Sequence, residues 1–420
     1  MSLSESAYDN QQQAASPSQP LLKPVQPDTI DLLTAALRDI LDIDSTQQAE
    51  TLRGRERQRV VIFRGTLIKD AETAFPVVEE RFHTLGYTPS MERQGEMDVI
   101  LAVEGLVVGR RIKTRAWLHL LLLILTIAST IFSASMFRGG VAPGTVKCTL
   151  DANNKLVCTD VSGNTVNAIL NEVQRNAPYA VPFGLTLLLI LGVHEMGHYI
   201  AARRHKVDVT LPFFVPLPFI SPLGTLGAVI FIRSMLKSKK ALFDVGISGP
   251  LAGFVVAFIA LIIGMRMPSY PDANRLITRV GTPILVEAVG KIVRPQDRNI
   301  SQFITRQPVA FAAWFGMFLT ALNLLPIGQL DGGHVTYTLF GRTAWTIAMV
   351  TFGGLIVLGV TVMPSFLFYA VLALLTGLRH PPPNNDITPL DNRRRLLGYA
   401  TLILFFLIAT PNPFPTLRGF

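Results

Sequence analysis

The chain has 420 residues and a formal net charge of +9, with 38 Lys and Arg against 29 Asp and Glu. Hydrophobic residues make up 49% of the chain and charged residues only 16%. This balance is typical of membrane proteins. No DNA- or RNA-binding motif accompanies the positive charge, so we attribute it to membrane topology and contact with anionic lipids. We expect a lipid bilayer, and no nucleic acid, as a partner.

The first 109 residues precede any long apolar run. Residues 1–28 are polar and rich in Pro and Gln, which predicts a disordered N-terminus. Residues 29–109 are predicted to form a small soluble α+β domain. Within it, 60–68 and 97–105 have the composition of strands, and 70–86 has helical periodicity that ends at a glycine. The start of the chain lacks the pattern of a cleaved signal peptide.

Residues 110–420 are predicted to form an all-α polytopic membrane domain with six to seven transmembrane helices. A helix needs about 20 predominantly apolar residues to cross a bilayer. The last two runs are short, and Pro364 either separates two spans or kinks one, so the number stays open. The clearest apolar runs are 116–137, 180–201, 244–266, 308–326, 343–363, 364–378 and 396–411.

Basic residues near the ends of these runs predict the orientation of the protein in the membrane. Clusters lie before the first run, after the second, and between the last two, which places them all on one side if the N-terminus is cytoplasmic. The loop 267–307 carries basic residues on the opposite side, but long loops follow the rule weakly. The clustered residues are Arg110, Arg111, Lys113, Arg115, Arg203, Arg204, Lys206, Arg379, Arg393, Arg394 and Arg395.

Cys148 and Cys158 lie in the loop after the first apolar run. The stretch KCTLDANNKLVCT predicts a strand, an Asn-Asn turn and a second strand, which would place the two thiols opposite each other. This loop is predicted to lie outside the cytoplasm, where a disulfide can form. The alternative is a pair of free, buried thiols.

Residues 194–198 read His-Glu-Met-Gly-His inside the second apolar run. Two histidines four residues apart lie on one face of a helix, where both imidazoles can reach one zinc ion. The carboxylate of Glu195 can then take a proton from a zinc-bound water. Ionisable side chains are costly in hydrocarbon and usually mark a functional site. We therefore predict that His194 and His198 bind a metal ion.

A catalytic zinc normally takes three protein ligands and keeps a position for water. The strongest candidate for the third ligand is Asp331, in ALNLLPIGQLDGGH at the far end of the fourth run. The predicted topology places it at the same cytoplasmic depth as the histidines. As alternatives, Asp331 caps a helix, or His334 competes as the ligand. Asn323 and Pro326 predict a distorted helix end beside the site.

Residues 209–234 are apolar but interrupted by Pro and Gly, so they predict a re-entrant loop or hairpin and not a spanning helix. The combination of HEMGH with Asn323, Pro326, Asp331 and Gly332 resembles the site-2 protease family of intramembrane zinc metalloproteases. The resemblance covers roughly 180–340 and includes the motifs at 224–228 and 246–254.

The arrangement is also similar to the photosynthetic branch of that family, the gravitropism-deficient, yellow-green type of chloroplasts and cyanobacteria. That branch has a Gly-Asn-Leu-Arg motif in its N-terminal domain. Residues 65–68 of this chain read Gly-Thr-Leu-Ile, which departs from the motif at its second and fourth positions. The resemblance implies a cyanobacterial plasma or thylakoid membrane, or a chloroplast membrane, as the location.

The family resemblance implies one Zn²⁺ per subunit, held by His194, His198 and Asp331. It implies that Glu195 acts as general base and that Asn323 donates to the developing oxyanion. The substrate would be a transmembrane protein, cleaved within its membrane segment during regulated intramembrane proteolysis, and 209–234 would offer it a strand edge. The competing functions are a polytopic metal-ion transporter and a proteolytically silent scaffold. A transporter would have little use for Glu195, and a silent scaffold would be expected to lack one of these residues.

Overall fold

The computed structural model describes residues 25–53, 56–106, 115–139, 146–150, 156–160, 166–218, 220–221, 223–232, 236–270, 279–410 and 412–415. The chain forms two compact units, of which the first comprises Met1–Val107 with Asn384–Thr388 and the second Val108–Pro383 with Pro389–Phe420. The disorder predicted for 1–28 falls mostly outside the described residues. Its last two residues, Pro27 and Asp28, belong to a helix.

The first unit is a four-stranded antiparallel sheet with two helices, in the strand order β1-β2-β4-β3. Its core contains the fully buried Leu33, Phe63, Phe82, Met91 and Ile100. The predicted strands and helix are present, but the sequence did not indicate α2, β1 or β3, since β1 is mostly polar and does not alternate. The elements are α2 Pro27–Leu37, β1 Leu41–Arg53, β2 Glu56–Leu67, α3 Ala71–Thr84, β3 Tyr87–Gln94 and β4 Met97–Glu104.

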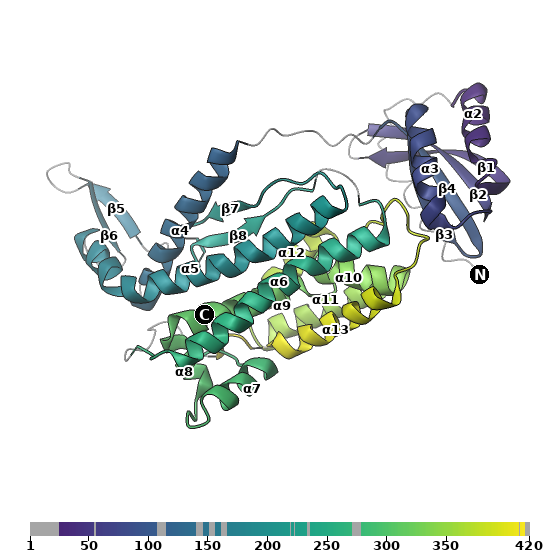
Figure 1. Cartoon of the computed structure of the whole chain (residues 1–420). Helices are drawn as coiled ribbons and strands as arrows, with labels where there is room; N and C mark the ends of the chain where they lie inside the picture. Colours follow the sequence, from purple (N-terminus) through teal and green to yellow (C-terminus); the bar gives the residue numbers. More distant parts are fainter. Residues whose placement is uncertain are drawn as a thin grey trace. The chain divides into compact units, whose positions relative to one another are not determined.

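The second unit consists of helices with two small hairpins (Figure 1). Its helices are α4 Ala116–Gly139, α5 Val166–Arg204, α6 Lys239–Arg266, α7 Ile284–Val293, α8 Ile300–Arg306, α9 Pro308–Asn323, α10 Asp331–Phe340, α11 Ala344–Thr361, α12 Ser365–Thr376 and α13 Asn392–Ile408. Its strands are β5 Val146–Leu150, β6 Leu156–Asp160, β7 Phe213–Pro216 and β8 Thr225–Val229. A core of apolar residues from α5, α6 and α9 holds the unit together.

Among the described residues, four helical segments are long and apolar enough to cross a membrane: Ala116–Met136, Ile169–Arg204, Lys239–Arg266 and Asp331–Thr361. The six to seven spans predicted from the sequence are therefore not confirmed. The runs 308–326, 364–378 and 396–411 form helices of only 16, 12 and 17 residues. Pro364 separates α11 from α12, so it does not kink a single span.

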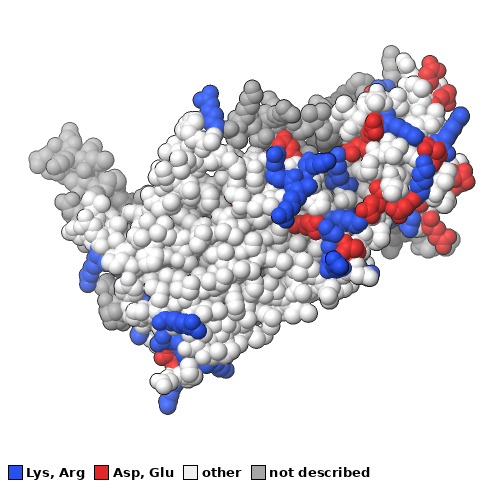
Figure 2. Space-filling model, viewed as in Figure 1, with Lys and Arg blue, Asp and Glu red and all other residues white. Residues whose placement is uncertain are grey.

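The surface of the second unit fits a lipid environment. Figure 2 shows a broad area over its helices without Lys, Arg, Asp or Glu. Large apolar side chains such as Val350 and Val360 on α11 and Phe406 on α13 are at least 70% exposed. An exposed apolar surface of this extent is unusual on a soluble monomer, and hydrocarbon is the solvent that suits it. The protein is thus a membrane protein.

Both predicted hairpins are present. In the first, β5 pairs with β6, and Cys148 lies directly opposite Cys158. In the second, β7 pairs with β8 within the Pro- and Gly-interrupted segment, and a bridge between Val209 and Ile232 extends the pairing. Strand β7 packs against α4, and β8 runs along α5 (Figure 1).

Glycines allow α5 and α6 to approach each other closely. A methyl group at Gly197 would lie 2.5 Å from the carbonyl oxygen of Ser248, and one at Gly249 would lie 2.1 Å from Nε2 of His198. At Gly253 it would lie 3.0 Å from Cβ of His194. Helix α6 therefore packs directly against the two histidines. A side chain larger than that of glycine does not fit at Gly249.

Substitution of Gly249 by Ala tests this packing. We expect the variant to lose about 1–3 kcal/mol of stability, because an added methyl group must displace the His198 ring or separate the helices. Gly353→Ala is the matched control, since a methyl group at Gly353 in α11 meets nothing within 4 Å. Thermal unfolding in detergent measures both variants. Equal melting temperatures for Gly249→Ala and wild type would contradict the packing.

The register of β5 and β6 generates a second prediction. We expect Cys148 and Cys158 to form a disulfide in the protein isolated from its membrane under non-reducing conditions, because directly opposed strand residues come within bridging distance. Peptide mass mapping with and without reduction measures the bond. Full alkylation of both thiols before reduction would show that they are free.

Candidate metal centre

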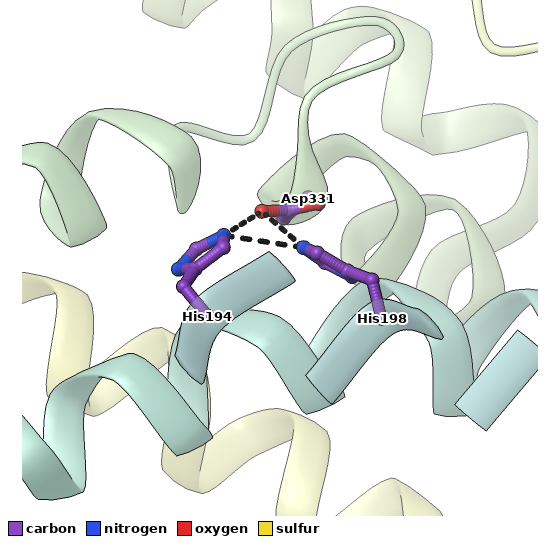
Figure 3. A group of neighbouring side chains, drawn as sticks. All are labelled: His194, His198 and Asp331. Carbon is purple, nitrogen blue, oxygen red and sulfur yellow. Dashed lines mark hydrogen bonds and ion pairs between the residues drawn. The ribbon is translucent and has the colours of Figure 1, made fainter. Parts of the chain in front are cut away.

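The His-Glu-Met-Gly-His motif lies in the last third of α5, a helix of 39 residues. The spacing of four residues points both imidazoles toward the same side (Figure 3). His194 is 4% and His198 7% exposed, so both rings are removed from solvent. Burial of two imidazoles beside each other is favourable only when they have polar or metal partners.

Asp331 reaches the same place from a different part of the chain. Helix α9 ends at Asn323, a short loop follows, and Asp331 is the first residue of α10. The loop folds tightly against the start of α10, because a methyl group at Gly332 would lie 2.0 Å from the carbonyl oxygen of Leu324. This close return of the backbone places the Asp331 carboxylate opposite the two histidines (Figure 3).

The three side chains form a group whose ligand atoms lie within 4.8 Å of one another. Nε2 of His194 is 3.1 Å from Nε2 of His198, and Oδ2 of Asp331 is 3.3 Å and 3.4 Å from these two atoms. A tetrahedral zinc ion with bonds of about 2.0–2.1 Å requires ligand atoms about 3.3–3.4 Å apart. The group can therefore hold zinc with three protein ligands.

The hydrogen bonds around the group support this conclusion. Nδ1 of His198 lies 2.7 Å from the carbonyl oxygen of Val245. Because a carbonyl only accepts, Nδ1 carries the proton, and in the neutral ring Nε2 presents a lone pair to the group. The carboxylate of Asp331 presents lone pairs as well. Such atoms repel one another unless a cation or a proton lies between them, and the set of two imidazoles and a carboxylate is typical of catalytic zinc.

Two further predicted site residues lie beside the group. The amide nitrogen of Asn323 is 3.3 Å from Nε2 of His194, at the end of α9. The Glu195 carboxylate accepts a hydrogen bond from the backbone N–H of Ile230, immediately after β8. The hairpin formed by β7 and β8 therefore contacts the residue that follows the first histidine. All five predicted site residues come together in one place.

His334 does not point to the same centre. Its Nδ1 lies 2.5 Å from Nε2 of His380, and Gly246 packs against its Cβ. Sequence reasoning did not assign a role to His380 or to the carbonyl of Val245. Nothing in the local sequence marks either residue, since one lies in a connection between helices and the other contributes only its backbone.

Comparisons with known proteins agree with this geometry. The model of Peptidase family M50 matches residues 182–358. The probable zinc metalloprotease EGY2, chloroplastic, of Arabidopsis thaliana is 29% identical over 239 residues, which are 56% of this chain and 42% of the relative. The probable zinc metalloprotease EGY1, chloroplastic, of Oryza sativa subsp. japonica is 31% identical over 239 residues, 55% of this chain and 41% of the relative.

The match thus spans less than half the length of these curated relatives. No solved structure matches the chain. The relatives confirm the resemblance to the gravitropism-deficient, yellow-green type, and the matched region contains every residue of the metal-binding group. Residues 182–358 are therefore similar to Peptidase family M50, and the relatives that match over half of the chain are named as probable zinc metalloproteases.

Proposed function

We propose that the protein is a zinc-dependent endopeptidase that cleaves the transmembrane segments of other membrane proteins, as in regulated intramembrane proteolysis. The observation that carries this proposal is the tetrahedral spacing of the His194, His198 and Asp331 ligand atoms on helices long and apolar enough to span a membrane. Among the described residues, this is the one group of three potential metal ligands from His, Cys, Asp and Glu. A transporter would require polar sites along several helices.

In the proposed reaction, Glu195 takes a proton from the attacking water and returns it to the leaving amine. Bound zinc would polarise the scissile carbonyl and bring the water's pKa close to neutral. Val245 fixes the ring of His198 through its carbonyl, so that Nε2 stays directed at the group. Asn323 lies at the edge of the group, where its amide can donate to the carbonyl oxygen as charge develops there.

The hairpin of β7 and β8 is suited to hold an unwound substrate segment in an extended conformation. A helix hides its peptide bonds in internal hydrogen bonds, so a transmembrane helix must unwind before cleavage. Strand β8 has Leu226 and Val229 exposed by 65% and 41%. An extended peptide can add to such an edge through backbone hydrogen bonds, which tolerate varied side chains. Ile230, the residue that follows this strand, contacts the Glu195 carboxylate through its backbone N–H.

For its location, we propose a cyanobacterial plasma or thylakoid membrane or a chloroplast membrane, with the N-terminus cytoplasmic. The similar proteins from rice and Arabidopsis are both named as chloroplast proteins. The orientation rests on the distribution of Lys and Arg along the sequence.

Replacement of Glu195 by Gln should abolish cleavage and leave zinc bound. We expect a loss of at least about 10²-fold, because the amide cannot accept the proton although it preserves the shape of the side chain. The measurement is cleavage of a transmembrane substrate in proteoliposomes, with zinc content determined in parallel. Cleavage that is equal in both proteins and insensitive to a chelator would contradict the proposal.

Replacement of Asp331 by Ala should lower the zinc content of the purified protein, because only two of the three ligands remain. Asp297→Ala serves as the control, since Asp297 pairs with Arg294 outside the group. Metal analysis by mass spectrometry measures both variants. Full zinc occupancy in Asp331→Ala would mean that another residue is the third ligand.

A further inference from the structure

Helix α4 holds the hairpin of β7 and β8 through a buried histidine. His119 lies in the first turn of α4, and its imidazole is 9% exposed. Nδ1 of this ring is 3.0 Å from the carbonyl oxygen of Pro212, the residue before β7. Because a carbonyl only accepts, Nδ1 carries the proton and donates it to Pro212. The first strand of the hairpin is therefore attached to α4 by a side-chain hydrogen bond.

This imidazole lies in an apolar environment. It belongs to Ala116–Met136, a segment long and apolar enough to cross a membrane. Its other nitrogen, Nε2, is buried and has no hydrogen-bond partner among the described residues. An apolar side chain would fill the same place without a buried unpaired nitrogen, and ionisable side chains in such segments usually serve a function. The N–H that His119 donates to Pro212 is what the imidazole supplies here and an apolar side chain could not.

Ring contacts connect His119 with the residue beside the metal-binding group. The imidazole lies against the ring of Phe213, with centroids 4.1 Å apart. Phe213 pairs with β8, and its ring contacts that of Phe231 at 5.7 Å. Ile230 precedes Phe231, and its backbone N–H donates to the carboxylate of Glu195. The path from His119 to Glu195 therefore crosses the hairpin once and stays within the second unit.

The opposite end of the hairpin, its turn, is held separately. The hydroxyl of Ser129 donates to the carbonyl of Gly224, and a methyl group at Gly224 would lie 2.3 Å from the carbonyl oxygen of Ser129. On the α5 side, a methyl group at Gly192 would lie 3.3 Å from the ring of Phe214. Ser129 thus holds the turn, and His119 holds the open end, where Ile230 meets Glu195.

We propose that His119 is a positioning residue, whose hydrogen bond to Pro212 determines where the open end of the hairpin lies against Glu195. Its effect on cleavage rests on the proposed function, in which β8 holds the substrate in an extended conformation. Loss of the bond would shift Ile230 and a substrate strand on β8 relative to Glu195 while every predicted metal ligand stays in place. Small errors in such an alignment lower the rate of a reaction strongly.

Three substitutions of His119 separate its N–H from its ring. His119→Asn keeps a donor, because the amide nitrogen of Asn corresponds to Nδ1 of the imidazole. In His119→Gln the amide nitrogen corresponds to Nε2, so the donor to Pro212 is lost in a side chain of similar size. His119→Phe keeps an aromatic ring against Phe213 and has no donor. The comparison of Asn with Gln decides the question even if the Phe variant does not fold.

Hydrogen exchange of the full chain in detergent tests the attachment without reliance on cleavage. In His119→Gln and His119→Phe we expect 226–232 to exchange about fivefold to thirtyfold faster, as for the loss of one or two hydrogen bonds. In His119→Asn we expect rates within about threefold of wild type, because the bond is kept. His83→Phe is the matched control, since His83 is exposed on α3 of the first unit. It should leave 226–232 unchanged.

Cleavage kinetics on the same variants test the positioning. In His119→Gln we expect kcat to fall about tenfold with KM within about twofold of wild type, because the strand that holds the substrate remains but its alignment is lost. His119→Asn should restore most of kcat, and zinc content should be unchanged in both. A role in stability alone would instead lower the melting temperature and leave Asn no better than Gln.

Three results would overturn the proposal. Wild-type exchange at 226–232 in His119→Gln would show that the bond does not hold the hairpin. Equal exchange in His119→Asn and His119→Gln would show that the N–H is not what matters. Faster exchange with unchanged kcat would show that the hairpin's place does not affect cleavage. A wild-type protein that cleaves no transmembrane substrate would refute the proposed function, and hydrogen exchange would still decide the attachment.

Discussion

The metal centre depends on the close approach of α5 and α6. Two imidazoles and a carboxylate are held with their lone pairs facing one another in a buried place, which is unfavourable unless a cation neutralises them. Helix α6 makes this arrangement possible because Gly249 leaves room for the ring of His198 and Val245 supplies the carbonyl that fixes its tautomer. A methyl group or any larger side chain at position 249 would occupy the space of the His198 ring.

The candidate site residues follow more directly from the sequence than the number of spanning helices does. The spacing of His194 and His198 follows directly from helical geometry, and the requirement of a catalytic zinc for a third ligand pointed to Asp331. The number of spanning helices could not be predicted in the same way. Hydropathy identifies apolar runs, but α9 and α12 are apolar and still too short by themselves to be counted as spans.

Other features carry no local signal in the sequence. Strand β1 is largely polar, so it pairs with β2 without the alternation that would have revealed it. The attachment of 384–388 to β3 joins residues almost 300 positions apart, and its hydrogen bonds are mainly to backbone atoms. Pairing of this kind depends on which edge of a sheet is free. That is a property of the folded unit and not of either segment.

The hairpin and the connection between α12 and α13 give the centre two different neighbours. The hairpin contacts Glu195 through Ile230 and presents an apolar strand to the membrane region, which suits an extended substrate. The connection between α12 and α13 contacts the side of the centre that carries Asp331.

X-ray absorption spectroscopy of the purified protein at the zinc edge tests the central claim most directly. The account predicts one zinc per chain, with two imidazole nitrogens, one carboxylate oxygen and one further light ligand at about 2.0–2.1 Å. A protein that contains no zinc after purification and zinc addition, or a spectrum with sulfur or only one imidazole in the coordination sphere, would contradict it.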